Sequence, residues 1–177
     1  MTQPSNLPQG TQEHKAKAEQ FVSIPVACIT VSDSRTEATD ESGKLMQRLL
    51  TEAGHTIAHY KLLPNKEEQV REYVRELLKG PADAVFLTGG TGLGEKDRTV
   101  EAVKSLIDRE IPGFGELFRY LSYAEQIGTA SILSRALAGG AGKKLIVSMP
   151  GSRAAVDLAL TRILIPELKH LIFELRR

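Results

Sequence analysis

The stretch "DAVFLTGGTGLGEKDRTV", residues 83–100, decides the fold because it passes from an apolar run through a cluster of glycines into a helical pattern. The apolar run ends at Thr88, and four glycines then fall within six residues, from Gly89 to Gly94. Short apolar runs bounded by glycine are typical of buried strands, and a strand followed by a helix is one unit of an α/β fold. The stretch therefore predicts a strand, a bare loop and a helix, in that order.

The same alternation of strand and helix recurs along the chain. "PVACITV" (25–31) is a continuous apolar run, as expected of a strand that is covered on both faces. Two more strands are expected at "TIAHYKLLP" and "KKLIVSMPG", and the segment 111–142 is expected to be mostly helical. Other helices are expected at 43–54, at 66–80, at 100–110, and after Ser152, a cap residue, with an interruption at Pro166. This pattern predicts a three-layer α/β/α fold with a mostly parallel central sheet flanked by helices.

The composition is that of an ordinary globular protein. With 177 residues, 41% of them hydrophobic, we expect a single domain over 22–177 preceded by a flexible polar leader over 1–21. A formal charge of +1 argues against a nucleic-acid partner, and no apolar run approaches the length that spans a membrane. The single cysteine, Cys28, is expected to be a buried strand residue, and the lack of disulfides predicts a cytoplasmic protein.

Polar and flexible sequences follow every expected strand. The loops after Val31, Leu63, Thr88 and Met149 read "SDSR", "PNKEE", "GGTGLGEKD" and "PGSR". Ligands of open α/β sheets bind at the carboxyl ends of the strands. These loops, which offer backbone N–H groups, hydroxyls and charges, are therefore expected to form a binding site together.

The glycine loop matches neither common nucleotide pattern. The dinucleotide fingerprint would need a glycine where Asp97 stands, and "GGAGKKL" lacks the Ser or Thr of a phosphate-binding P-loop. The backbone N–H groups of successive glycines can still bind an anion, and the Thr91 hydroxyl adds a further donor. Asp97 is a carboxylate at a place where a phosphate-bound Mg²⁺ would need an oxygen ligand. The alternative is a glycine-rich connection with solvent-exposed charges, and these residues alone leave both interpretations open.

Several motifs in a fixed order carry a resemblance to a known family. The chain resembles the MoaB/MogA family of molybdenum cofactor biosynthesis, and its motifs are closer to those of the MoaB branch. The motifs are, in order, "LTGGTG" followed by Asp97-Arg98-Thr99, then "DREIPGFGELFR", "ILSRALAG" and "MPGS". The resemblance covers about residue 24 to the C-terminus and implies the fold of the gephyrin G domain. It also implies binding of molybdopterin and transfer of AMP from Mg-ATP to molybdopterin, which releases pyrophosphate. The family further implies homotrimers or hexamers, and contacts with other cofactor biosynthesis proteins.

The resemblance also implies roles for individual residues. Gly89, Gly90, Thr91 and Gly92 would hold phosphate through backbone N–H groups, and Asp97 would bind Mg²⁺. The remaining positions that would bind substrate are Ser32, Asp33, Glu116, Arg119, Ser122, Pro150, Gly151 and Ser152. Candidate cations for the two polyanionic substrates are Lys96, Arg98, Arg119 and Arg153. The four histidines show no ligand spacing along the sequence.

One position departs from the family pattern. The resemblance implies that active members often carry Asp after the proline that closes the second strand, whereas this chain has Pro64-Asn65. Asn65 stands three residues before Glu68, so we favour a role as a helix cap over a catalytic role. Two functions therefore remain open: a molybdopterin adenylyltransferase, which Asp97 favours, and a non-catalytic molybdopterin-binding or assembly protein, which Asn65 favours.

Overall fold

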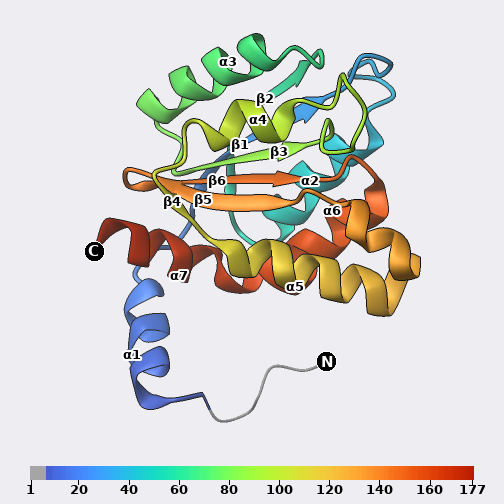
Figure 1. The fold of residues 1–177 in the computed structure, drawn as a ribbon. Helices are drawn as coiled ribbons and strands as arrows, with labels where there is room; N and C mark the ends of the chain where they lie inside the picture. The colour runs from blue at the N-terminus through green and yellow to red at the C-terminus, as the bar shows by residue number, and fades with distance from the viewer. Residues whose placement is uncertain (1–6) are drawn as a thin grey trace.

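The computed structural model describes residues 7–177, which form a central mixed sheet flanked by helices on both faces (Figure 1). The six strands follow the order β2-β1-β3-β6-β5-β4 across the sheet. Neighbouring strands among β2, β1, β3 and β6 are parallel, whereas β5 runs antiparallel to β6 and to β4. The strands are β1 (Pro25–Val31), β2 (Thr56–Leu63), β3 (Ala84–Thr88), β4 (Arg109–Glu110), β5 (Leu137–Ala141) and β6 (Lys144–Met149). The α/β fold expected from the sequence is therefore confirmed.

The described chain contains helices of three kinds. The α-helices are α1 (Gln9–Ala18), α2 (Glu41–Glu52), α3 (Glu67–Lys79), α4 (Thr99–Lys104), α5 (Pro112–Ser122), α6 (Arg153–Ala159) and α7 (Ile165–Arg176). The π-helices are η1 (Tyr123–Ile127) and η3 (Leu160–Leu164), and η2 (Gly128–Leu133) is a 3₁₀-helix. Ser152 caps α6 by accepting a hydrogen bond from the Ala155 N–H, as the sequence predicted. The interruption expected at Pro166 does not occur, because α6, η3 and α7 follow one another without a break and Pro166 stands in the first turn of α7. No helix in the described part of the chain is long and apolar enough to cross a membrane.

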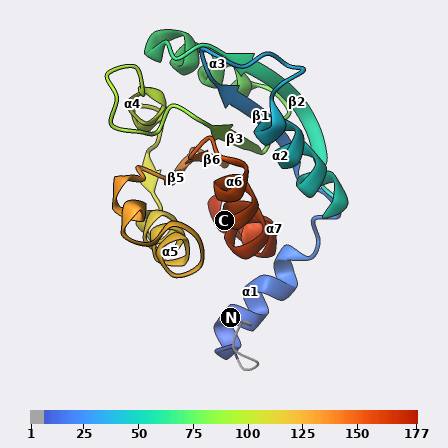
Figure 2. The ribbon, with the colours of Figure 1, turned by 90° about the vertical axis from the view of Figure 1, so that its right-hand side faces the viewer.

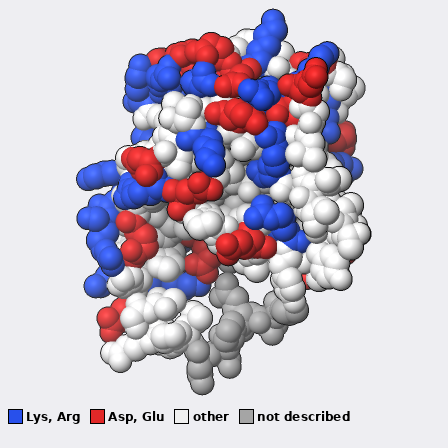
Figure 3. Space-filling model, viewed as in Figure 1, with Lys and Arg blue, Asp and Glu red and all other residues white. Residues whose placement is uncertain are grey.

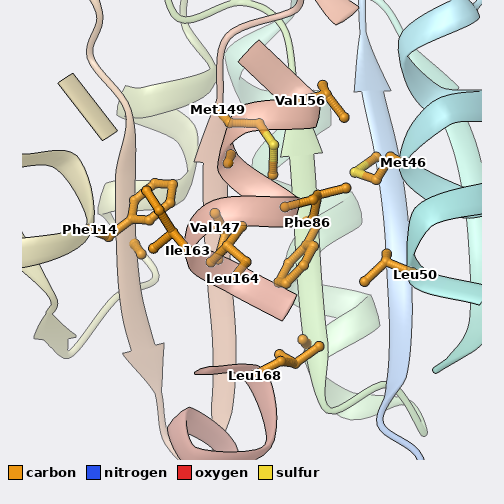
Figure 4. Packing of buried hydrophobic residues seen from close by; sticks show 14 of the residues in the cluster. Met46, Leu50, Phe86, Phe114, Val147, Met149, Val156, Ile163, Leu164 and Leu168 are labelled. Carbon is orange, nitrogen blue, oxygen red and sulfur yellow. The ribbon is translucent and has the colours of Figure 1, made fainter. Parts of the chain in front are cut away.

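Each face of the sheet has its own hydrophobic core. Strand side chains alternate between faces, so Val26 and Cys28 pack toward α2 and α5 to α7, while Ala27 and Ile29 pack toward α3 and α4. Figure 2 shows these two groups of helices on opposite sides of the sheet. Figure 4 shows side chains from β3, β6 and the helices meeting in the larger core. Burial raises the pKa of the Cys28 thiol to about 12, so it is a packing residue, as expected.

The segment expected to be helical over 111–142 contains an antiparallel sheet edge instead. Residues 112–133 are helical, but Leu137–Ala141 forms β5, and a two-residue connection, Gly142-Lys143, returns the chain into β6. Gly142 has φ +59°, the backbone region in which hairpin turns take glycine. The helical prediction was wrong here because "LAGGA" has no strand periodicity, and pairing with β6 supplies the hydrogen bonds that make it a strand.

The segment before β1 also differs from the expectation. A flexible leader was predicted through residue 21, but Gln9–Ala18 is helix α1, which lies beside α7 outside the three layers (Figure 1). Ala18 is buried, and Lys15 of α1 and Glu19, directly after it, form ion pairs with Glu167 and Lys169 of α7. These contacts join residues about 150 positions apart, so the local sequence could not reveal them. Residues 1–6 of the expected leader lie outside the described residues.

Candidate functional site

A cavity of about 540 Å³ lies at the carboxyl ends of the parallel strands. Its walls come from the loops after β1, β2, β3 and β6, as expected from the sequence, together with residues of η1 and η2 and of the segment after η2. Ten residues of the sequence-based site line it: Ser32, Asp33, Asn65, Gly89, Gly90, Thr91, Gly92, Asp97, Pro150 and Gly151. The volume suits a small organic ligand.

Four other predicted residues do not line this cavity in the single described chain. Glu116 and Arg119 line a separate cavity of about 190 Å³ beside β4 and α5. Ser122 is buried at the end of α5, and the side chain of Ser152 caps α6. Their roles toward a ligand therefore stay predictions.

The glycine loop needs bare backbone because other groups occupy the space that side chains would take. Gly89 and Gly90 have φ of +98° and +64°. A Cβ on Gly89 would lie 2.2 Å from the Val31 carbonyl oxygen. A Cβ on Gly90 would lie 2.2 Å from Thr99 Oγ1 and 2.4 Å from Asn65 Oδ1. These glycines therefore serve close packing between loops as well as a turn.

Among the N–H groups of Gly89 to Gly92, one is used and three are available. The Gly89 N–H donates to the Met149 carbonyl at 3.0 Å, which corrects its expected role as a phosphate donor. The N–H groups of Gly90, Thr91 and Gly92 donate to no acceptor within residues 7–177. Three successive unpaired donors beside a cavity can bind an anion.

Asn65 does not cap α3, so the capping prediction was wrong. The helix begins at Glu67 after Lys66, without a side-chain cap. The Asn65 backbone N–H donates to Asp33 Oδ1 at 2.8 Å, while the tight turn from Pro64 to Lys66 directs the side chain toward Gly90 instead of α3.

The side-chain oxygen of Asn65 has an unusual environment. Oδ1 is buried and accepts no hydrogen bond in the described part of the chain, and the same is true of Thr99 Oγ1. An unsatisfied buried polar group costs about 1–3 kcal/mol. Two such groups behind one loop at the edge of a cavity need a partner from outside the described chain, which water, a ligand or an ion can supply.

Asp97 is held at the cavity by its own loop and by an arginine that the sequence did not single out. Asp97 Oδ2 accepts a hydrogen bond from the Gly94 N–H at 3.2 Å. The guanidinium of Arg135, just before β5, donates to the carbonyls of Asp97 at 2.6 Å and Thr91 at 3.3 Å, and pairs with Glu101. Arg135 stands inside the motif "ILSRALAG", which was the available signal for its importance.

Arg35 is the basic residue that lines the cavity in the described chain, and sequence reasoning missed it. It stands in the "SDSR" loop, where its guanidinium donates to the Gly151 carbonyl at 2.8 Å and lies 3.5 Å from Asp40 Oδ1. Asp40 is fully buried and caps α2 by accepting from the Gly43 N–H at 3.0 Å. Burial by itself would raise the pKa of Asp40, but hydrogen bonds, including one from Tyr60 at 2.6 Å, and the Arg35 charge together lower it.

The cations proposed from the sequence lie elsewhere. Among the described residues, Lys96, Arg98, Arg119 and Arg153 do not line the cavity. Arg98 pairs with Glu67 at 3.0 Å, and Arg153 with Glu41 at 3.4 Å. Figure 3 shows basic and acidic side chains interspersed over the face that carries α3 and α4, where ion pairs such as Arg75–Glu72 occur. Charge is therefore balanced on this face, and the cavity obtains its positive charge from Arg35.

The site thus combines three kinds of group with complementary chemistry. The N–H groups of Gly90 to Gly92 and the guanidinium of Arg35 can bind anionic oxygens. The carboxylates of Asp33 and Asp97 and the amide oxygen of Asn65 are the ligands that Mg²⁺ accepts. The arrangement suits a phosphorylated ligand that arrives with a divalent cation.

Comparison with known proteins gives one consistent result. Residues 27–170 match the model of a family described as a probable molybdopterin binding domain. The chain is 47% identical to the molybdenum cofactor biosynthesis protein B of Bacillus subtilis over 167 residues, which cover 94% of this chain and 97% of that protein. The corresponding protein of Bacillus cereus is 46% identical over 166 residues, with coverage of 93% and 97%.

Comparison with solved structures points to the same family. A crystal structure of a molybdenum cofactor biosynthesis protein B has a TM-score of 0.85 and 46% identity, and covers 88% of this chain and 97% of that one. The tungsten cofactor synthesizing protein MoaB from Pyrococcus furiosus has a TM-score of 0.79 and 36% identity, with coverage of 88% and 98%.

Proposed function

The chain belongs to the family of probable molybdopterin binding domains, and we propose that it acts in molybdenum cofactor biosynthesis by binding molybdopterin in the cavity described above. The relatives named above are molybdenum cofactor biosynthesis proteins B, and they match nearly the whole chain. The proposal includes a reaction in which molybdopterin receives AMP from Mg-ATP.

The observation that carries the proposal is the composition of one corner of the cavity. The unpaired N–H groups of Gly90, Thr91 and Gly92 stand beside the buried, unsatisfied oxygen of Asn65 and near the carboxylate of Asp97. Donors for a phosphate and oxygens for a cation are thus placed together. A plain surface loop has no reason to bury an amide oxygen without a protein partner beside such donors.

In the proposed reaction, an oxygen of the terminal phosphate of molybdopterin attacks the α-phosphorus of ATP. A new P–O bond forms, the bond to the β-phosphate oxygen breaks, and pyrophosphate leaves with the electron pair. The attacking oxygen is already an anion at neutral pH, so no side chain has to remove a proton. The task of the protein is to bring two polyanions together and to stabilise the charge that develops.

The chain's own groups can divide this task. The N–H groups of Gly90 to Gly92 bind phosphate oxygens, and Arg35, held by the Gly151 carbonyl, adds a fixed positive charge. Asp97, Asp33 and Asn65 offer the oxygens that would hold Mg²⁺. Bound there, Mg²⁺ would neutralise charge on the phosphates of ATP.

One observation favours a second candidate function. Asn65 is neutral at the position where active family members carry a carboxylate, and a neutral oxygen attracts a divalent cation less strongly. A protein that binds molybdopterin and presents it to another cofactor biosynthesis protein would need the cavity but not the cation.

One experiment separates these two functions. Purified protein is incubated with molybdopterin and Mg-ATP, and the mixture is assayed for adenylated molybdopterin and pyrophosphate by chromatography and mass spectrometry. Catalytic formation of both products supports the adenylyltransferase. Binding of molybdopterin without either product supports the binding protein, and absence of binding contradicts both.

The proposal extends to self-association. Six large apolar side chains of α5 and the segments that follow it are exposed: Leu117, Tyr120, Tyr123, Ile127, Ile132 and Leu133. Two of them, Ile127 and Leu133, also line the cavity, so a second copy packed on this surface would lie at its entrance. We expect a homotrimer or a hexamer, which light scattering on the eluted protein would detect.

A further inference from the structure

The contact between α1 and α7 brings together three metal-binding side chains that are far apart in the sequence. His14 lies on α1, and His170 and Glu174 lie one turn apart on α7. One ligand atom from each residue lies within 4.8 Å of the other two. This cluster is composed of residues outside those that line the phosphate-binding cavity.

Neighbouring groups orient the ligand atoms of this cluster. Nδ1 of His170 lies 3.0 Å from Glu167 Oε2, and because a carboxylate only accepts, Nδ1 must carry the proton. The lone pair of the neutral ring is then on Nε2, which lies 3.9 Å from Glu174 Oε1. A carboxylate behind a histidine in this way is the usual outer partner of a metal-binding histidine, and it is supported from α1 by an ion pair with Lys15.

The third ligand converges on the same oxygen. Nδ1 of His14 lies 2.7 Å from Glu174 Oε1. That oxygen is buried and accepts no well-formed hydrogen bond among the described residues. If Nδ1 of His14 carries no proton, a lone pair of this nitrogen faces a lone pair of Glu174 Oε1 at 2.7 Å, and the two repel. A proton or a metal cation between the two atoms removes this repulsion.

The separations suit a metal of the zinc type. Tetrahedral zinc with bonds of about 2.0–2.2 Å places its ligand atoms roughly 3.4 Å apart. The observed separations from Glu174 Oε1, 2.7 and 3.9 Å, lie on either side of this value. Two imidazoles with one carboxylate favour zinc-type ions over Mg²⁺ or Ca²⁺, which prefer oxygen ligands.

Two other groups compete with a metal ion for the space between these ligand atoms: a proton on His14 and the side chain of Arg177. A guanidinium nitrogen of Arg177 lies 3.4 Å from Glu174 Oε2 and 3.5 Å from His14 Nε2. The Arg177 side chain is 60% exposed at the end of the chain, so it can turn away into solvent when an ion enters.

We propose that His14, His170 and Glu174 form a site for a zinc-type divalent cation that fastens α1 to α7. The ion joins a helix that otherwise contacts the domain through few buried residues. The side chains of the three ligands are partly exposed, so water can supply a fourth ligand. The site is independent of the Mg²⁺ and nucleotide proposed for the cavity.

The test is a titration of the purified full-length protein with Zn²⁺ by calorimetry, repeated with Co²⁺ by visible absorption. Millimolar Mg²⁺ is present throughout to occupy the carboxylates of the cavity. We expect one ion per chain, a tetrahedral Co²⁺ spectrum, and loss of that binding in His14→Ala and in Glu174→Gln. Glu167→Gln, which removes the carboxylate behind His170, should weaken the affinity for Zn²⁺ roughly 10–100-fold.

The matched control is His59→Ala. His59 is an exposed histidine that contacts Tyr73 on the other side of the sheet, so its loss should leave the affinity unchanged. Hydrogen exchange gives a second measurement: Zn²⁺ should slow the exchange of α1 amides in the wild type but not in His14→Ala. Absence of Zn²⁺ binding, or equal binding in His14→Ala and the wild type, would overturn the proposal in favour of a protonated His14 paired with Glu174.

Discussion

The backbone N–H of Asn65 donates to Oδ1 of Asp33 at 2.8 Å and thereby joins the loop after β2 to the loop after β1. Both residues line the cavity, and the bond leaves the side-chain oxygen of Asn65 buried beside the bare backbone of Gly90. The relationship places Asn65 at the wall of the cavity instead of at a helix cap. The electrostatics of the cavity therefore depend on whether this side chain is neutral or charged.

Replacing Asn65 by Asp should increase the rate of AMP transfer. The new carboxylate keeps the size of the side chain and strengthens the attraction for Mg²⁺. The measurement is turnover as a function of Mg²⁺ concentration, where the variant should reach half of its maximal rate at lower Mg²⁺. Asn65→Ala, which removes the oxygen, is the control and should not show the increase. Unchanged turnover and Mg²⁺ dependence in Asn65→Asp would show that the missing charge does not limit the reaction.

Replacing Asp97 by Ala should lower AMP transfer by orders of magnitude, while molybdopterin binding largely survives. The variant loses a carboxylate at the proposed cation site but keeps the N–H groups of Gly90 to Gly92. Glu95→Ala, at an exposed position of the same loop, is the matched control and should keep wild-type activity. Adenylated product and bound molybdopterin are measured separately. Equal activity in Asp97→Ala and the wild type would remove Asp97 from the mechanism.

Replacing Gly90 by Ala should destabilise the protein and abolish ligand binding. Gly90 has φ +64°, and a Cβ there would overlap with Asn65 Oδ1 and Thr99 Oγ1. Gly142→Ala is the matched control, because Gly142 has φ +59° but no heavy atom within 4 Å of the added Cβ. The positive φ costs each variant about 1–2 kcal/mol, so urea unfolding should show a larger loss for Gly90→Ala. Equal losses, with binding retained, would show that the loop tolerates a side chain.

The carboxyl group of Asp40 should make the protein sensitive to acid. Its pKa is lower in the folded state than its ordinary value of 3.8, so the unfolded chain binds protons more readily at acidic pH. The stabilisation is therefore fully present above the ordinary value, and it is lost as the pH falls through the lower folded pKa. Urea unfolding over a pH series should show a steeper acid loss of stability in the wild type than in Asp40→Asn. Parallel curves would contradict this role of Asp40.

The strands of the parallel region could be predicted because their signal is local. "PVACITV" and "AVFLT" are continuous apolar runs, and both faces of these strands are covered by helices. The position of the site followed from the same information, since polar loops at the carboxyl ends of parallel strands have to converge. β5 could not be predicted, because "LAGGA" becomes a strand only through its hydrogen bonds with β6.

Within the site, residue type could be predicted but contacts could not. Asn before "KEEQ" is a normal cap in an isolated helix, yet the turn after Pro64 directs its oxygen to Gly90. Arg35 stands in one of the strand-end loops and Arg135 inside the motif "ILSRALAG", but neither position showed which groups these side chains would contact. Their importance comes from carbonyl groups that lie more than 35 residues away along the chain.

The sequence by itself determined the alternation of strands and helices, the buried faces, the glycine loop and the family, since all of these follow from residue type and short-range spacing. Only the tertiary structure decided that the side chain of Asn65 lies beside Gly90 and not at α3. It also decided that the Gly89 N–H donates to the Met149 carbonyl and that His14 lies against Glu174. Hydrogen bonds and ion pairs act over a few ångströms, and the parallel crossovers bring distant segments within that range. Spacing along the chain does not record such distances.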